Sequence, residues 1–132
     1  MDFMKEKKFG FGCMRMPVKN KEDQTSFDYE TIEALFDKFL EQGFTYFDTA
    51  YTYHGYHAEE AVRKALVERY DRKEFQLATK MPLRDFKDSE DLERIFAEQL
   101  KTAAWNILIF ICYITREEMF MKSAENMMRS IL

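Results

Sequence analysis

An aspartate, a tyrosine and a lysine stand in this sequence at positions where three chemical roles can converge. Asp48 ends the short segment 44–48, which is rich in aromatic and β-branched residues, and Lys80 ends a second such segment, 75–80. Segments of this kind are typical of β-strands. Tyr53 lies in the polar loop after Asp48. With a helix between the strands, both charged groups lie at the carboxyl ends of parallel strands, where α/β proteins place their chemistry.

The chain before Asp48 predicts a strand and an amphipathic helix. Residues 9–16 are expected to form a first strand, and Asp28 is a candidate N-cap for a helix that Gly43 ends. Apolar residues fall on one face of this helix: Ile32, Leu35, Phe36, Phe39 and Leu40. The helix therefore leads directly into the strand that carries Asp48.

Two more helices are expected, one on each side of the strand that carries Lys80. The earlier one runs from about Ala58 to Tyr70, and the later one is capped by Asp88 or Ser89. The earlier helix has an inward set, Ala58, Ala61, Val62, Ala65 and Leu66, and a solvent-facing set, Glu59, Glu60, Arg63 and Lys64. The later helix has an inward set, Leu92, Ile95, Phe96 and Leu100. The element order is then β-α-β-α-β-α.

Repeated βα units predict an α/β fold with a parallel sheet, either an open doubly wound sheet or a closed (β/α)8 TIM barrel. An open sheet that binds a dinucleotide would carry a GxGxxG motif after a strand. Gly10 and Gly12 supply only the first two glycines, and no convincing helix follows them. The pattern therefore favours the barrel.

Composition narrows the class of partner. The 132 residues are 46% hydrophobic and 33% charged, which is typical of one globular domain. A net charge of −4 argues against binding to nucleic acid. The start of the chain lacks the apolar region of a signal peptide, and Cys13 and Cys112 have no metal-type spacing. We expect a cytoplasmic protein with no membrane or nucleic-acid partner.

The stretch from Gly43 to Tyr53 resembles a signature of the aldo-keto reductases, Gly-x-Thr-x-Phe-Asp-Thr-Ala-x-x-Tyr. A Glu-rich helix start and a strand that ends in Ala-Thr-Lys follow it here. The resemblance covers about residues 9–101. It implies the N-terminal part of a (β/α)8 barrel, NADPH as cofactor, without deciding NADP over NAD, and a small-molecule aldehyde or ketone as substrate.

The same resemblance assigns a role to each of the three side chains. Tyr53 would be the general acid that protonates the carbonyl oxygen as hydride arrives. Lys80 would be the cation that favours the phenolate, and Asp48 would keep Lys80 charged. Asp48 would also lie near the nicotinamide. Reduction of a carbonyl to an alcohol, or the reverse reaction, is the implied activity.

Several other interpretations remain open at this stage. Taken singly, Lys80 could be a solvated surface lysine, Tyr53 a loop residue over the core edge and Asp48 an N-cap or turn residue. Lys80 could instead form a Schiff base in another barrel chemistry. The fold also occurs in non-catalytic, cofactor-binding regulatory subunits. A zinc site at His54 and His57 has no obvious third ligand, so no metal is expected.

The resemblance stops after residue 101, which divides the chain into 1–101 and a divergent tail, 102–132. The family continues with a strand of the type Tyr-x-Asp-x-Tyr-Leu-Leu-His, whose His is the fourth catalytic position. The tail, from Trp105 onward, has neither that Asp nor that His. Reading its codons one base earlier permits Met-Glu-Tyr-Phe-Asp-Phe-Tyr-Leu-Leu-His, because the single Trp codon followed by Asn106 forces Glu. We therefore hypothesise a frameshift.

If the tail is instead genuine, residues 105–114 could form a buried strand, too short to cross a bilayer, and a helix could follow Thr115. A complete barrel needs about 250 residues. We therefore expect this chain to be an inactive fragment whose open barrel edges favour self-association. The loops that would identify the substrate are not expected in this part of the barrel.

Overall fold

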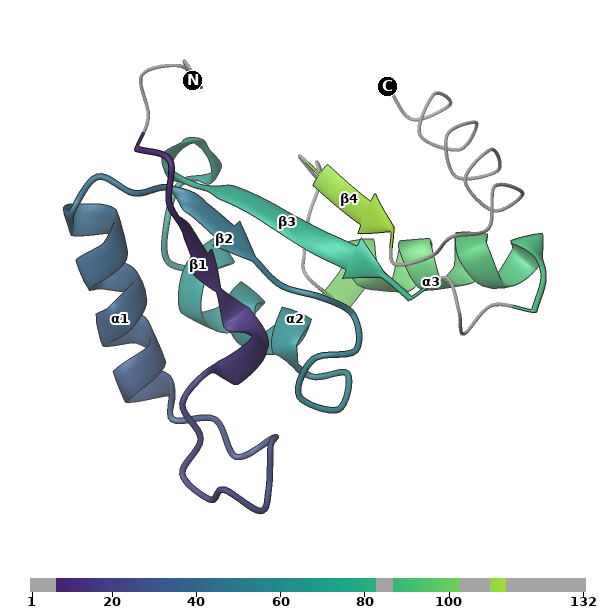
Figure 1. The fold of residues 1–132 in the computed structure, drawn as a ribbon, viewed down its shortest axis with the longest axis horizontal. Coiled ribbons are helices and arrows are strands. Elements are labelled where there is room, and N and C mark those ends of the chain that lie inside the picture. Colours follow the sequence, from purple (N-terminus) through teal and green to yellow (C-terminus); the bar gives the residue numbers. More distant parts are fainter. Residues whose placement is uncertain (1–6, 83–86, 103–109, 114–132) are drawn as a thin grey trace.

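The structure is a computed structural model that describes residues 7–82, 87–102 and 110–113. Its centre is a parallel four-stranded sheet: β1 (Gly10–Gly12), β2 (Tyr46–Asp48), β3 (Gln76–Met81) and β4 (Phe110–Tyr113) (Figure 1). The strands lie in sequence order, β1-β2-β3-β4. An open doubly wound sheet reverses its strand order at a switch point, and a (β/α)8 barrel does not. The order therefore agrees with the first part of a barrel.

Helices connect the strands. They are α1 (Tyr29–Glu41), α2 (Ala58–Val62), which continues as the π-helical turn η2 (Arg63–Val67), and α3 (Ser89–Thr102). Short 3-10 turns follow β1 (η1, Cys13–Arg15) and precede β3 (η3, Arg72–Glu74). In Figure 1, α2 and α3 lie behind the sheet. No helix among the described residues is long and apolar enough to cross a membrane.

The ends of α1 are those that the sequence predicts. The Asp28 carboxylate accepts hydrogen bonds from the backbone N–H of Thr31 (3.3 Å) and from its hydroxyl (2.8 Å). Gly43 adopts φ +81° after the last turn and donates its N–H to the Leu40 carbonyl (2.8 Å). A residue with a side chain is strained in this conformation, so a glycine suits the end of the helix.

The first strand is shorter than predicted. Only Gly10, Phe11 and Gly12 pair with β2, opposite Tyr46, Phe47 and Asp48. Beyond Gly12 the chain has no partner there because β2 itself ends at Asp48, and it turns into η1. The expected extent of 9–16 was therefore wrong at its carboxyl end.

Aromatic rings fill the space between α1 and the first two strands. The Phe47 ring lies 4.9 Å from Phe36, 5.2 Å from Phe39 and 5.8 Å from Phe11, measured between centroids. Phe36 and Phe47 are fully buried. Leu35, which was expected on the same apolar face, is 41% exposed. The aromatic cluster therefore holds β2, and with it Asp48, against α1.

One solvent-side prediction for α2 was wrong. The side chains of Ala58, Ala61, Val62, Ala65 and Leu66 are buried as expected. Glu59, however, is only 3% exposed, because the first turn of α2 faces β3 and α3. Glu60 and Lys64 form a partly exposed ion pair (2.8 Å) on the outer side of the helix.

The last helix agrees with its prediction, and the tail is described only in part. In α3, Leu92, Ile95 and Phe96 are buried and Leu100 is partly buried. Asp88 accepts from the N–H of Asp91 (3.0 Å) and so caps the helix. Within 105–114, β4 pairs with β3. The helix expected after residue 115 lies outside the described residues.

Candidate active site

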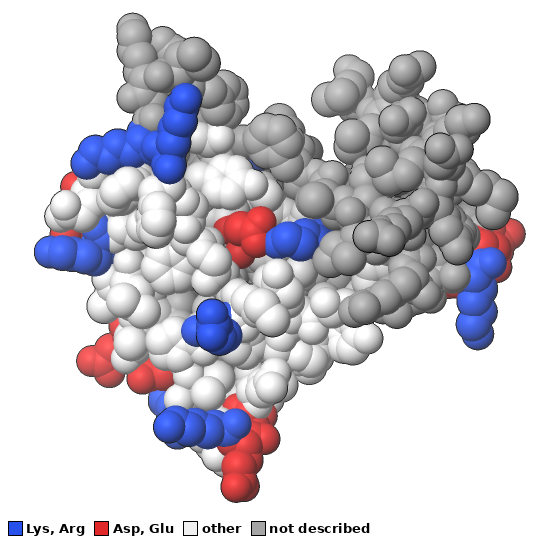
Figure 2. All heavy atoms as spheres, viewed as in Figure 1, with Lys and Arg blue, Asp and Glu red and all other residues white. Residues whose placement is uncertain are grey.

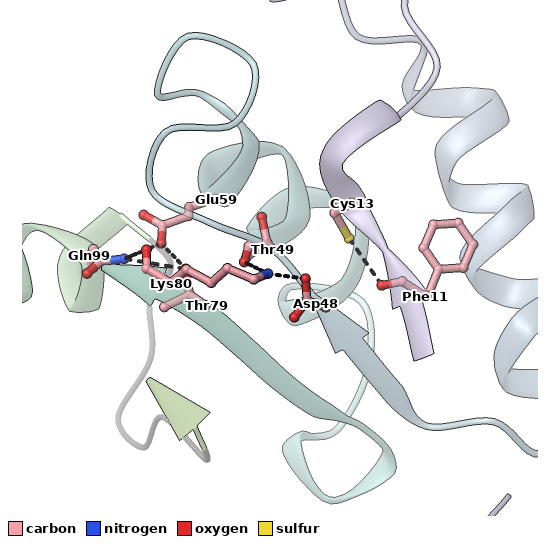
Figure 3. A network of polar contacts seen from close by, with 8 residues as sticks. All are labelled: Phe11, Cys13, Asp48, Thr49, Glu59, Thr79, Lys80 and Gln99. Carbon is pink, nitrogen blue, oxygen red and sulfur yellow. Dashed lines mark hydrogen bonds and ion pairs between the residues drawn. The ribbon is translucent and has the colours of Figure 1, made fainter. Parts of the chain in front are cut away.

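Two of the three predicted side chains form an ion pair at the carboxyl ends of adjacent strands. The Lys80 ammonium donates to Oδ1 of Asp48 and to the backbone carbonyl of Thr49 (3.1 Å) (Figure 3). Asp48 pairs with Ala78 in the ladder, and side chains two residues apart on a strand share a face. The ladder register therefore brings Lys80 to the face on which Asp48 lies. The Lys80 side chain is 19% exposed and the Asp48 side chain is 34% exposed.

Tyr53 completes the group from the loop between β2 and α2. The Lys80 Nζ lies 5.3 Å from the centroid of the Tyr53 ring, within the range of a cation–π contact. The backbone fixes Tyr53 on both sides: its N–H donates to Ala50 (3.2 Å) and its carbonyl accepts from Ala58 (3.2 Å). The structure thus brings Asp48, Tyr53 and Lys80 together around one ammonium group.

The surroundings of Lys80 favour its charged form. Partial burial lowers the pKa of the ammonium, but the hydrogen bond to Asp48, the charge of Asp48 and the neighbouring Tyr53 outweigh this effect and raise the pKa overall. Lys80 is therefore a cation at neutral pH. A Schiff-base lysine must offer a free amine to its carbonyl partner. The environment of Lys80 thus suits a charged ammonium that stabilises a neighbouring group better than a free amine that attacks a carbonyl.

The loop that carries Tyr53 has unusual backbone geometry. His54, Gly55 and Tyr56 all have positive φ, at 50°, 59° and 72°. His54 is buried, and its ring bonds the backbone at both nitrogens: Nε2 accepts from Met16 N–H (3.2 Å), and Nδ1 lies 2.8 Å from the Gln24 carbonyl. This pattern requires the neutral ring with its proton on Nδ1. The imidazole therefore clamps the loop to the chain that follows β1.

That clamp leaves His54 no free nitrogen for a metal. The Nδ1 atom of His57 lies 2.7 Å from the Gly55 carbonyl. Across residues 7–82, 87–102 and 110–113, no three side chains of His, Cys, Asp or Glu gather in a way that could hold a metal ion.

Cys13 is fully buried near the ion pair but is chemically inert there. Its thiol donates weakly to the Phe11 carbonyl (3.9 Å). Burial strongly raises the pKa of this thiol, and the charge of Asp48 raises it further. The sulfur therefore stays protonated and packs as a small apolar group.

Three aromatic residues in or beside the loop that carries Tyr53 have different surroundings. Phe47 belongs to the core, against α1. Tyr51 donates its hydroxyl to Glu98 (3.1 Å) and packs edge-on against Tyr56 (5.3 Å between ring centroids), which is 58% exposed.

The face in Figure 2 carries described side chains of both charge signs, mostly around its rim, rather than one continuous basic or acidic patch.

Sequence reasoning missed a buried polar cluster on the other side of β3. Glu59 accepts hydrogen bonds from Thr79 and Gln99, and all three side chains are buried. A signal was present: Glu59 lies three residues before Val62 and seven before Leu66, so it shares their helix face. The two consecutive glutamates resemble ordinary first-turn charges, which hid this signal.

Comparisons with known proteins bear on the family and the fold of the chain. A model of the aldo/keto reductase family matches residues 8–108. No curated protein matches the chain. A solved aldo-keto reductase of Klebsiella pneumoniae in complex with NADPH is 20% identical, with a TM-score of 0.69 over 92% of this chain and 41% of that one.

Two other solved structures are similar to this chain in fold and over a similar share of their length. The holo form of the aldo-keto reductase AKR11C1 of Bacillus halodurans is 22% identical, with a TM-score of 0.68 over 92% of this chain and 41% of its own. An aldo/keto reductase of Brucella melitensis is 22% identical, with a TM-score of 0.60 over 91% of this chain and 43% of its own. The chain thus spans about two-fifths of these proteins, and its fold is an incomplete (β/α)8 barrel.

Proposed function

The chain belongs to the aldo/keto reductase family, and from that premise we propose that Asp48, Tyr53 and Lys80 are residues of a site for NADPH-dependent reduction of an aldehyde or ketone, or the reverse reaction. The observation that supports this proposal is the position of Lys80, whose ammonium pairs with Asp48 and lies over the Tyr53 ring. The substrate is a small carbonyl compound.

The chemistry of the three groups fits a proton donor. A phenol has an ordinary pKa of about 10, and a neighbouring cation favours its ionised form. Tyr53 can therefore give its proton to a carbonyl oxygen that becomes negative, while Lys80 stabilises the phenolate that remains. Asp48 holds Lys80 in place and in its charged form. Solvent then returns a proton to Tyr53.

The residues present also fit a nicotinamide cofactor at this end of the sheet. Asp48 and Lys80 are both partly exposed at the carboxyl ends of β2 and β3, the end at which α/β folds bind their ligands. When bound, the cofactor supplies the hydride that adds to the carbonyl carbon. We propose that Asp48 lies near the nicotinamide. The family's other cofactor contacts are expected from parts of the barrel outside these residues.

We further propose that these 132 residues, as a separate polypeptide, bind NADPH poorly and reduce no carbonyl. The support is that they span about two-fifths of the solved relatives, and that a parallel sheet whose edge strands β1 and β4 have no second strand partner among the described residues does not enclose a site. The same edges are expected to promote self-association. We expect the protein in the cytoplasm, where a reducing environment suits the free thiol of Cys13.

The first experiment measures NADPH binding by fluorescence and cofactor oxidation with a panel of aldehydes. We expect weak binding and no turnover by the chain. Tyr53→Phe and Tyr56→Phe are compared, since Tyr56 lies in the same loop and is exposed. Tight NADPH binding with turnover that Tyr53→Phe abolishes and Tyr56→Phe retains would refute the inactivity and support the role of Tyr53.

The frameshift hypothesis supplies the second experiment. A fresh read of the gene around codons 101–105 tests it: an intact frame upstream that encodes no strand like Tyr-x-Asp-x-Tyr-Leu-Leu-His after a one-base shift refutes the idea. If the shift is present, the restored product can be expressed and assayed. Loss of carbonyl reduction in its Tyr53→Phe variant, with activity kept in Tyr56→Phe, is the expected result. Equal activity in both would contradict the role of Tyr53, and NADPH binding without any carbonyl reduction by the restored product would favour a non-catalytic module on the same fold.

A further inference from the structure

A buried carboxylate oxygen joins three elements behind the proposed site. Oε1 of Glu59, in the first turn of α2, accepts from the Thr79 hydroxyl of β3 (2.6 Å) and from the Gln99 side-chain amide of α3 (2.7 Å) (Figure 3). Glu59 is 3% exposed, and Thr79 and Gln99 are fully buried. Burying a carboxylate opposes folding unless hydrogen bonds replace its water, and both bonds here fall on one oxygen.

The cluster is attached to the backbone around Lys80. Thr79 directly precedes Lys80, and consecutive residues of a strand point to opposite faces of the sheet. Glu59 therefore holds β3 from the helix side, and Lys80 projects from the other side. The Gln99 amide also lies 3.4 Å from the carbonyl oxygen of Lys80, which Tyr51 N–H reaches at 3.2 Å.

The residue before Glu59 is bonded to the backbone of Tyr53. The N–H of Ala58, the first residue of α2, donates to the Tyr53 carbonyl (3.2 Å), and Glu59 is the next residue. The Glu59 side chain thus connects the first turn of α2, which bonds the Tyr53 carbonyl, to β3, which carries Lys80. The chain before Tyr53 is joined to β3 by backbone bonds from Thr49 and Tyr51 and by the bond from Lys80 to Thr49.

We propose that Glu59 is a positioning residue: through Oε1 it sets the distance between the Tyr53 ring and the Lys80 ammonium. The inference rests on the proposed function for its meaning in catalysis, but the geometry it describes does not. Without the acceptor oxygen, Thr79 and Gln99 lose a buried partner, and the first turn of α2 loses this hydrogen bond to β3. The Tyr53 ring then moves relative to Lys80.

Substitution of Glu59 can separate its role as a hydrogen-bond acceptor from an effect of its negative charge. A glutamine retains an Oε1 that can accept both bonds, and an alanine does not. Glu59→Gln should therefore preserve the Tyr53–Lys80 geometry, and Glu59→Ala should lose it. Thr79→Val tests the partner, since it removes the hydroxyl at nearly constant shape. Glu60→Gln is the matched control, because Glu60 is the next residue and is partly exposed.

The experiment measures the NMR chemical shift of the Lys80 ε-methylene protons in the full chain. A tyrosine ring displaces the resonances of protons above its face, so Tyr53→Leu gives the value without the ring. We expect Glu59→Ala to lose most of that displacement, Thr79→Val to lose a smaller part, and Glu59→Gln and Glu60→Gln to retain it. Urea unfolding in parallel shows which variants are folded.

The proposal is overturned if folded Glu59→Ala keeps the displacement of the wild type, or if Glu60→Gln loses as much as Glu59→Ala. If Glu59→Ala does not fold, Thr79→Val decides in the same way: full displacement in that folded variant overturns the proposal. The measurement needs neither cofactor nor substrate. Failure of carbonyl reduction would therefore leave this result standing, and a negative result here would leave the proposed role of Tyr53 untouched.

Discussion

The strand-borne half of the site and its loop-borne half are held by different forces. Asp48 and Lys80 lie on neighbouring strands whose ladder and aromatic core fix their positions. Tyr53 lies in a loop with three residues at positive φ, which the His54 ring clamps to a distant segment. Packing and register therefore determine one half, and two long-range hydrogen bonds to one imidazole determine much of the other. The halves should fail separately.

The largest effect is expected from the core beneath the strand-borne half. Phe47→Ala removes a fully buried ring and should lower the free energy of unfolding by about 3–5 kcal/mol. Leu35→Ala, at an exposed apolar position, should cost less than about 1 kcal/mol. Urea unfolding measures both. Similar costs for the two variants would show that the aromatic cluster does not support β2.

A smaller and more local loss of stability is expected when the His54 ring, which clamps the loop, is removed. His54→Ala leaves the Met16 N–H and the Gln24 carbonyl without their partner and should cost about 1–3 kcal/mol. Hydrogen exchange should speed up at the Met16 amide and stay slow in β2 and β3. If the strand amides exchange faster to the same extent, the loop and the strands form one unit and the comparison fails.

The smallest effect is expected at the tip of the loop. Gly55 has φ +59°, and a Cβ added there would meet no atom within 4 Å, so Gly55→Ala introduces backbone strain but no clash. It should cost about 1 kcal/mol. Gly12→Ala is the control, because that position is also open but has no positive φ. Equal stability of the two variants in urea would show that the loop conformation carries little strain.

The strand-borne half could be predicted from the sequence because its determinants are local. Apolar β-branched and aromatic runs that end in Asp48 and Lys80 indicate both strands, and Asp28 and Gly43 mark the ends of the helix before them. The extent of β1 could not be predicted in this way, since it depends on where its neighbour β2 stops.

The loop-borne half depends on contacts between residues far apart in sequence. The partners of His54 lie 38 and 30 residues away, so its ring suggested only a metal site. Glu59 was misplaced although its spacing to Val62 and Leu66 places it on the buried helix face, because two consecutive glutamates in a first turn resemble ordinary solvent-facing charges. Its partners in β3 and α3 are also far away in sequence.

The charge state of Lys80 depends on both halves of the site, because its neighbours are Asp48 on β2 and Tyr53 in the loop. Its folded pKa is raised, so the stabilisation from its pairing is fully present below the ordinary lysine value of about 10.4 and is lost as pH rises through the folded value. Asp48→Asn removes the partner and should lower the pKa of Lys80. Asp37→Asn is the matched control, since Asp37 is equally exposed and pairs with Arg69 instead.

The most direct test of the account is the pKa of Lys80, measured by competitive acetylation and mass spectrometry in the wild type, Asp48→Asn and Asp37→Asn. If Asp48, Tyr53 and Lys80 form one charge-coupled group, the pKa of Lys80 lies above the ordinary lysine value in the wild type and in Asp37→Asn, and falls in Asp48→Asn. An ordinary pKa that is the same in all three proteins would contradict the account.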